Sequence, residues 1–254
     1  MDDVPLERLD DLWDFGDPAE SERRFTALLV RARRDESGRH VAETLTQIAR
    51  AQGLQRRFED ADRTLDDAQA ALGADDDRTR VRILLERGRV ANTAGREGRG
   101  SEEFLAAWEL ARASGEDGLA VDAAHMLGIV EPPESAWEWN ERAIELARSS
   151  TDPAARRWVA SVANNMAWAK HDAGAYEEAL DLFELALAER ERQDDPGRTR
   201  VARWSVARCL RSLGRTEEAL AEQQSLAAEL EALSESDEYV IEEIAECLRA
   251  LGRA

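Results

Sequence analysis

The sequence predicts an all-α protein, built as a solenoid of antiparallel helix pairs. Two observations support this prediction. Apolar residues recur with the period of an α-helix along nearly the whole chain. Small residues also recur inside these apolar stretches at intervals of 39, 40, 39, 40 and 38 residues, at Ala49, Gly88, Gly128, Ala167, Ala207 and Ala245. A regular interval of this length indicates a repeat architecture, in which each repeat packs on its neighbours.

Each small residue marks the first helix of a repeat. Apolar residues precede it at fixed positions, as in Leu45-x-x-Ile48-Ala49 and Ala163-x-x-Met166-Ala167. Side chains at this spacing share one face of a helix, so they predict a buried stripe. We expect the small residue to let a neighbouring helix approach closely.

A second helix is expected after each first helix. Its clearest forms begin at Gly174-Ala175-Tyr176-Glu177-Glu178-Ala179-Leu180 and at Gly214-Arg215-Thr216-Glu217-Glu218-Ala219-Leu220. The glycine ends one helix because it accepts the left-handed cap conformation. The two glutamates favour the positive N-terminal end of the next helix. Helix starts are also predicted where an aspartate can cap and a proline can follow, at Asp17-Pro18, Asp152-Pro153 and Asp195-Pro196.

The predicted elements divide one continuous solenoid domain into three parts. Residues 1–36 form a degenerate half-repeat, with Leu6, Leu9, Leu12 and Trp13 in its first half. Residues 37–236 form five helix pairs, of which the third has a short first helix because Pro132-Pro133 stops it. Residues 237–254 form a capping helix. Its outer face is expected to present Glu242, Glu243, Glu246 and Arg249 to solvent.

At these positions the chain resembles the tetratricopeptide repeat (TPR) family. The unit Ala160–Arg192 matches the family consensus at Ala167, Gly174, Tyr176, Ala179, Phe183 and Ala186, and the next unit matches it at Ala207, Gly214, Ala219 and Leu220. The resemblance covers roughly residues 17–252. It is to the long-period bacterial type, because the repeat is about 40 residues long rather than about 34. The resemblance implies a right-handed superhelix with a concave groove.

Composition and charge argue against several classes of partner. The 254 residues include 54 acidic and 34 basic side chains, for a formal net charge of −20. Nucleic acids and anionic membranes attract positive surfaces, so neither is an expected partner. No apolar run approaches the ~20 residues of a membrane span, and the N-terminus lacks a signal-peptide pattern. We therefore expect a cytoplasmic protein with reduced Cys209 and Cys247.

The sequence shows no pattern of a catalytic, cofactor or metal site. His40, His125 and His171 are far apart, and none neighbours a cysteine. The only lysine, Lys170, follows Ala169, which excludes a Gly-Lys-Ser/Thr phosphate-binding loop. A Gly-x-Ser-x-Gly nucleophile elbow is also missing. We therefore expect a non-enzymatic protein without a cofactor or a bound metal.

The candidate binding residues share one face of the first helices. With the small residue numbered as repeat position 8, positions 4, 7, 8 and 11 form the core stripe, and positions 2, 5, 6, 9 and 13 lie on the other side. In the TPR family the second set faces the concave groove. In this chain it includes Arg50, Arg82, Arg89, His125, Asn164, Asn165, Trp168, Trp204 and Arg208. Tryptophan and arginine are frequent anchors of protein partners. The alternative is that these residues serve superhelical packing in an arginine-biased sequence.

Three functions are compatible with these patterns. The first hypothesis is an interaction scaffold that binds a peptide or protein segment in its concave groove, with Arg208 pairing with an acidic group of the partner. The second is a structural module that forms a homodimer. The third is a sensor in which a small ligand or a signalling peptide changes the shape of the superhelix.

Overall fold

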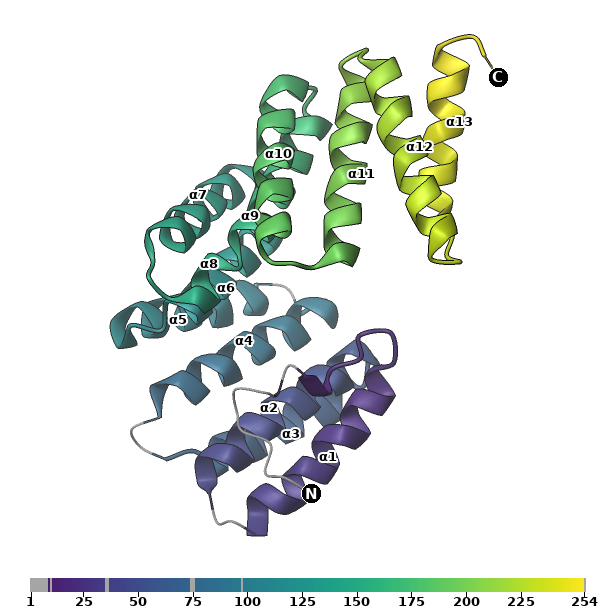
Figure 1. Ribbon diagram of the computed structural model, residues 1–254. Coiled ribbons are helices and arrows are strands. Elements are labelled where there is room, and N and C mark those ends of the chain that lie inside the picture. Colours follow the sequence, from purple (N-terminus) through teal and green to yellow (C-terminus); the bar gives the residue numbers. More distant parts are fainter. Residues whose placement is uncertain (1–8, 10, 35–36, 74–75, 97, 254) are drawn as a thin grey trace. The chain divides into compact units, whose positions relative to one another are not determined.

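The computed structural model describes residues 9, 11–34, 37–73, 76–96 and 98–253 (Figure 1). These residues form α-helices joined by short connections, with a short 3₁₀ segment near Leu12 and without any β-strand. Leu6 of the predicted half-repeat lies outside the described residues. In chain order the helices are α1 (Pro18–Arg34), α2 (Gly38–Leu54), α3 (Phe58–Ala71), α4 (Asp77–Thr93), α5 (Arg99–Ser114), α6 (Asp117–Val130), α7 (Pro133–Ser149), α8 (Pro153–Arg156), α9 (Val159–Asp172), α10 (Tyr176–Arg192), α11 (Pro196–Ser212), α12 (Thr216–Ala232) and α13 (Glu238–Ala250).

By their contacts the helices form two compact units, Met1–Leu146 and Ala147–Ala254. In each unit, helices that are neighbours in sequence pack side by side, as α11, α12 and α13 do in Figure 1. First helices of successive repeats also touch, as α2 and α4 do in the first unit. The fold class predicted from the sequence, an all-α solenoid of helix pairs, is therefore confirmed. No helix in the described part of the chain combines the length and apolarity that crossing a bilayer needs.

Each unit has its own apolar core. In the first unit Phe25 and Leu65 are completely buried between α1, α2 and α3, and Phe104 is completely buried on α5. Trp108 and Trp139 meet edge to face there, with ring centroids 5.6 Å apart. In the second unit Phe183 of α10 is buried at the repeat position that Phe104 occupies on α5. Burial of these large side chains gives the pairs most of their stability.

The small residues of the first helices allow the close approach that the sequence predicts. A Cβ atom placed on Gly88 would lie 2.4 Å from the ring of Phe104, and one on Gly128 would lie 2.5 Å from the side chain of Asn140. Ala167 and Ala207 have no exposed surface. These four small residues therefore lie where their helices are closely packed.

The predicted helix ends are also confirmed. The carboxylates of Asp152 and Asp195 accept hydrogen bonds from the backbone N–H groups of Ala154 and Arg198, at 2.8 and 3.0 Å. Gly174 and Gly214 both have a φ of 78°, which the left-handed cap requires. Because Pro132 and Pro133 cannot continue a helix, α6 ends at Val130 and α7 begins at Pro133.

Candidate functional site

The structure divides the predicted site residues between the two units. We use "inner face" for repeat positions 2, 5, 6, 9 and 13 of a first helix. In the first unit the predicted residues are Arg50 on α2, Arg82 and Arg89 on α4, and His125 on α6. In the second unit they are Asn164, Asn165 and Trp168 on α9, with Trp204 and Arg208 on α11. The two groups differ in how many of their polar groups already have partners.

The arginines of the first unit are paired with acids on the same inner faces. Arg82 approaches Glu43 at 3.0 Å, and Arg50 approaches Glu86 at 3.2 Å. Both ion pairs join α2 to α4. Arg89 then links Glu86 to Asp122 on α6. The carboxylates of Glu43 and Glu86 are buried beneath their arginines. These acids occupy positions 2 and 6 and were not among the predicted site residues, which include only Arg82 and Asn165 at those positions.

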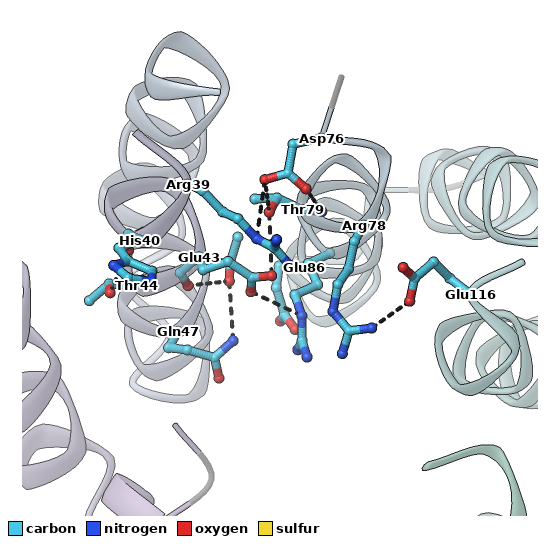
Figure 2. Close-up of polar contacts among 12 residues, drawn as sticks. Arg39, His40, Glu43, Thr44, Gln47, Asp76, Arg78, Thr79, Glu86 and Glu116 are labelled. Carbon is cyan, nitrogen blue, oxygen red and sulfur yellow. Dashed lines mark hydrogen bonds and ion pairs between the residues drawn. The ribbon is translucent and has the colours of Figure 1, made fainter. Parts of the chain in front are cut away.

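Further polar contacts continue this network between α2, α4 and α6. Figure 2 shows the carboxylates of Glu43 and Asp76 converging on the hydroxyl of Thr79, while Arg78 reaches Glu116 at the start of α6. Burial by itself would lower the pKa of Arg89, but the carboxylates of Asp122 and Glu86 outweigh it and raise that pKa above its ordinary value. The charges of this inner face therefore neutralise one another.

The chain's own N-terminal segment covers the inner face of α2. The indole N–H of Trp13 donates to the side-chain carbonyl of Gln47 at 2.9 Å. Trp13 stacks on Phe15 at a centroid distance of 4.8 Å, and the guanidinium of Arg50 lies 5.8 and 5.9 Å from these two rings. An inner face of this protein thus holds a non-helical segment through an amide and an arginine.

A row of aromatic rings crosses the inner face of the second unit. The rings of Trp168 and Trp204 are 6.0 Å apart, and Trp204 meets Tyr239 of α13 edge to face at 6.2 Å. Trp168 is further supported by Phe183 at 4.9 Å. Both tryptophans are half-buried, while Tyr239 is 67% exposed. Tyr239 was not among the site residues predicted from the sequence, although it occupies inner-face position 2 of its helix.

Two side-chain amides beside this row have no partner. Asn164 and Asn165 are half-buried on α9. Among the described residues neither side chain forms a hydrogen bond, whereas Gln47 of α2 is bonded at both amide atoms. A free amide can donate and accept at once, which matches the N–H and C=O groups of a peptide backbone. The inner face of α9 therefore holds two amides that are not committed to other side chains.

Arg208 is paired with Glu243, which corrects the expected role of that glutamate. We expected Glu243 on the solvent face of the last helix, but it is 7% exposed and lies between two arginines. Its carboxylate approaches Arg208 at 3.3 Å and Arg211 at 2.8 and 3.1 Å. Glu243 occupies inner-face position 6 of α13, so it lies opposite position 9 of α11. The carboxylate of Glu243 is thus shared by two guanidinium groups.

Among the described residues there is no group of three or more His, Cys, Asp and Glu side chains that could hold a metal ion. Cys209 and Cys247 are buried and free, and burial raises the pKa of the Cys209 thiol to about 11. The nucleophilic thiolate form is therefore disfavoured at neutral pH. The polar groups that remain available are suited to binding.

The helix pairs define an α-helical repeat protein. The tetratricopeptide repeat model matches residues 158–228, from the start of α9 into α12. In this segment the chain is similar to the tetratricopeptide repeat family. The comparison with curated proteins finds no significant match.

Several solved structures share this fold. BtubC (BKLC) from P. vanneervenii is 17% identical with a TM-score of 0.65, over 92% of this chain and 94% of that one. NprR in complex with its cognate peptide NprX is 18% identical with a TM-score of 0.55, over 97% of this chain and 71% of that one. Acl4, the assembly chaperone of RpL4, is 17% identical with a TM-score of 0.52, over 99% and 97%. At these identities the likeness concerns the fold.

Proposed function

We propose that this protein is a non-enzymatic interaction scaffold that binds a peptide or protein segment on the inner face of its second unit. The observation that supports this most directly is the pair of half-buried amides, Asn164 and Asn165, left without partners beside the rings of Trp168 and Trp204. When an amide without a partner is buried by a ligand, it loses its hydrogen bonds to water. This loss is unfavourable unless the ligand supplies hydrogen bonds in their place. An extended backbone supplies such donors and acceptors, and the rings cover its apolar side chains.

Two further observations support a segment as the ligand. On α2, Gln47 and Arg50 already hold the N-terminal segment of the same chain through Trp13. Among proteins of this fold, NprR is known in complex with a peptide, and Acl4 is an assembly chaperone of a protein. The arrangement on α2 supplies a precedent within the molecule for recognition of an irregular segment by an inner face.

An acidic group in the partner fits the immediate surroundings of Arg208. Arg208 and Arg211 share the single carboxylate of Glu243. A carboxylate of the partner would balance the second guanidinium and could pair with Arg208. The first unit offers no such excess, because the arginines of its inner face are matched by Glu43, Glu86 and Asp122. We place the protein in the cytoplasm, where its two buried free thiols stay reduced.

The test is selection of peptides from a displayed library on the purified chain, followed by calorimetry with the selected peptide. Replacing both Asn164 and Asn165 with Ala should weaken binding about 30-fold, since lost hydrogen bonds to a buried ligand cost about 1 kcal/mol each. The same variant should melt as the wild type does, because neither amide has a partner to lose. Gln224→Ala, an exposed amide on α12, is the matched control. Unchanged affinity in the double variant would contradict the proposed site.

A further inference from the structure

The last helix exposes positions that are covered elsewhere in the repeats. Ile241 of α13 occupies repeat position 4 and is 59% exposed. The same position holds Leu45 on α2, which is 4% exposed, and Ala163 on α9, which is completely buried. In those repeats a second helix follows and packs on the first. No second helix packs on α13 among the described residues, so its apolar stripe is open there.

The first helix has the pattern of a second helix of a repeat. Ser21, Phe25 and Leu28 of α1 are buried with the spacing of Ala179, Phe183 and Ala186 on α10. The alignment places Ala27 and Val30 of α1 at the positions of Leu185 and Ala188, which are half-buried on α10. On α1 Ala27 is exposed and Val30 is 50% exposed. The helix α1 is thus of the second type, whereas α13 is of the first type.

These two surfaces carry opposite charge. The α1 end face consists of Arg23, Ala27, Val30, Arg33 and Arg34, all exposed. The α13 end face consists of Glu238, Ile241, Glu242 and Ala245, of which Ala245 is half-buried. Among the described residues, the side chains of Arg33, Arg34, Glu238 and Glu242 have no ionic partner. Each face therefore places unpaired charges of one sign around a small apolar centre.

The positions of these charges along the two helices also match. Helices of a pair joined by a short turn run antiparallel, so the start of the first helix lies beside the end of the second. Glu238 lies in the first turn of α13, and Arg33 and Arg34 lie in the last turn of α1. An α1 helix packed on α13 in the usual antiparallel way would bring these residues together.

We propose that copies of this chain associate head to tail, with α1 of one copy packed on α13 of the next, where a second helix packs in the other repeats. Such an interface joins two different surfaces, so it adds further copies or closes a ring rather than stopping at a symmetric dimer. It uses none of the residues proposed to bind the peptide, so the association is independent of the proposed peptide binding.

Sedimentation velocity of the full chain over a wide concentration range tests this. We expect the average mass to increase with concentration and to fall at high salt, because exposed charges are screened. Arg33→Glu with Arg34→Glu gives one charge-reversed variant, and Glu238→Arg with Glu242→Arg gives the other. Each variant alone should remain monomeric. Their mixture should associate again, because each reversed face then meets a face of opposite charge.

The matched control is Arg156→Glu with Arg157→Glu, which reverses two adjacent exposed arginines away from both end faces and should associate as the wild type does. Circular dichroism establishes that all variants are folded. The proposal is overturned if the wild type stays monomeric at every concentration. It is also overturned if both reversals leave association intact, or if the mixture of folded variants fails to restore it.

Discussion

At the scale of single residues, the tightest constraint is the absence of a side chain at Gly88. Glycine in a helix interior costs about 1 kcal/mol relative to alanine, so its presence there needs a packing reason. The ring of Phe104 supplies it, since a Cβ on Gly88 would lie 2.4 Å from that ring. Replacing Gly88 with Ala should lower the free energy of unfolding by about 1–3 kcal/mol through overpacking. Urea denaturation measures this.

Gly197 is the control for that substitution. It lies in the first turn of α11, where an added Cβ would meet only the Asp195 carboxylate at an ordinary 3.7 Å. Gly197→Ala should leave stability unchanged or raise it, because alanine favours the helix. Equal loss of stability in both variants would mean that Phe104 does not limit the space at Gly88.

His125 makes stability depend on pH. Burial lowers its pKa from the ordinary value of 6.5, Asp122 opposes the shift, and Arg89 adds to it. Above pH 6.5 the side chain is neutral in both states. As the pH falls below 6.5 the unfolded chain takes up the proton first, so the free energy of unfolding decreases until the lowered pKa of the folded state is reached. Between about pH 7 and about pH 5.5 the wild type should lose more stability than His125→Gln. Equal losses in the two proteins would exclude this role.

The sequence predicted which side of its helix a residue faces better than it predicted which side chain that residue contacts. Helical spacing correctly predicted that Ala167 and Ala207 face neighbouring helices, because one helix wheel determines which side a residue faces. The partner of a side chain depends also on how two helices are aligned with each other. A helix wheel describes a single helix, so it cannot predict that alignment. Glu243 was therefore expected in solvent, although it lies beneath Arg208 and Arg211 of another helix.

At the scale of elements, buried ion pairs connect the first helices of successive repeats in the first unit. Glu86 receives Arg50 from α2 and Arg89 from its own helix, and its side chain is only 5% exposed. Removing one member of a buried ionic network leaves the other charges uncompensated. Glu86→Ala should therefore lower the free energy of unfolding by about 3 kcal/mol or more. Thermal and urea denaturation measure the loss.

A glutamate with an equally direct but exposed ion pair provides the comparison. Glu218 contacts Arg215 at 2.7 Å on the surface of α12. Water already solvates both groups, so Glu218→Ala should change stability far less than Glu86→Ala. If the two variants lose similar stability, the network between α2, α4 and α6 does not contribute through burial.

The order of elements was predictable because small residues mark the first helices and capping signals mark several helix ends. An Asp-Pro pair at a helix start and a glycine at a helix end act through neighbouring residues alone. They could therefore be recognised in the sequence and used to position helices along the chain. The covering of α2 was not predictable in the same way. Trp13 was predicted to belong to a half-repeat, but its bond to Gln47 joins residues 34 positions apart. Only the folded chain brings that segment onto the inner face of the next helix.

At the scale of the whole molecule, the two units have different roles in the proposals. The proposed binding site, with Asn164, Trp168, Trp204 and Arg208, lies entirely within Ala147–Ala254. The proposed head-to-tail interface instead needs α1 from one unit and α13 from the other. One truncation therefore separates the two activities.

A fragment that begins at Ser150, after α7, keeps α8 to α13 and the core around Phe183 and Leu220. Helical circular dichroism and a cooperative melting transition first establish that it folds. The folded fragment should bind the selected peptide with the affinity of the full chain, because it retains every side chain of the site. It should also remain monomeric at all concentrations, since it lacks α1. Calorimetry and sedimentation measure the two properties on the same sample. A folded fragment that lost peptide binding would show that the first unit contributes to recognition, and one that still associated would show that α13 pairs without α1.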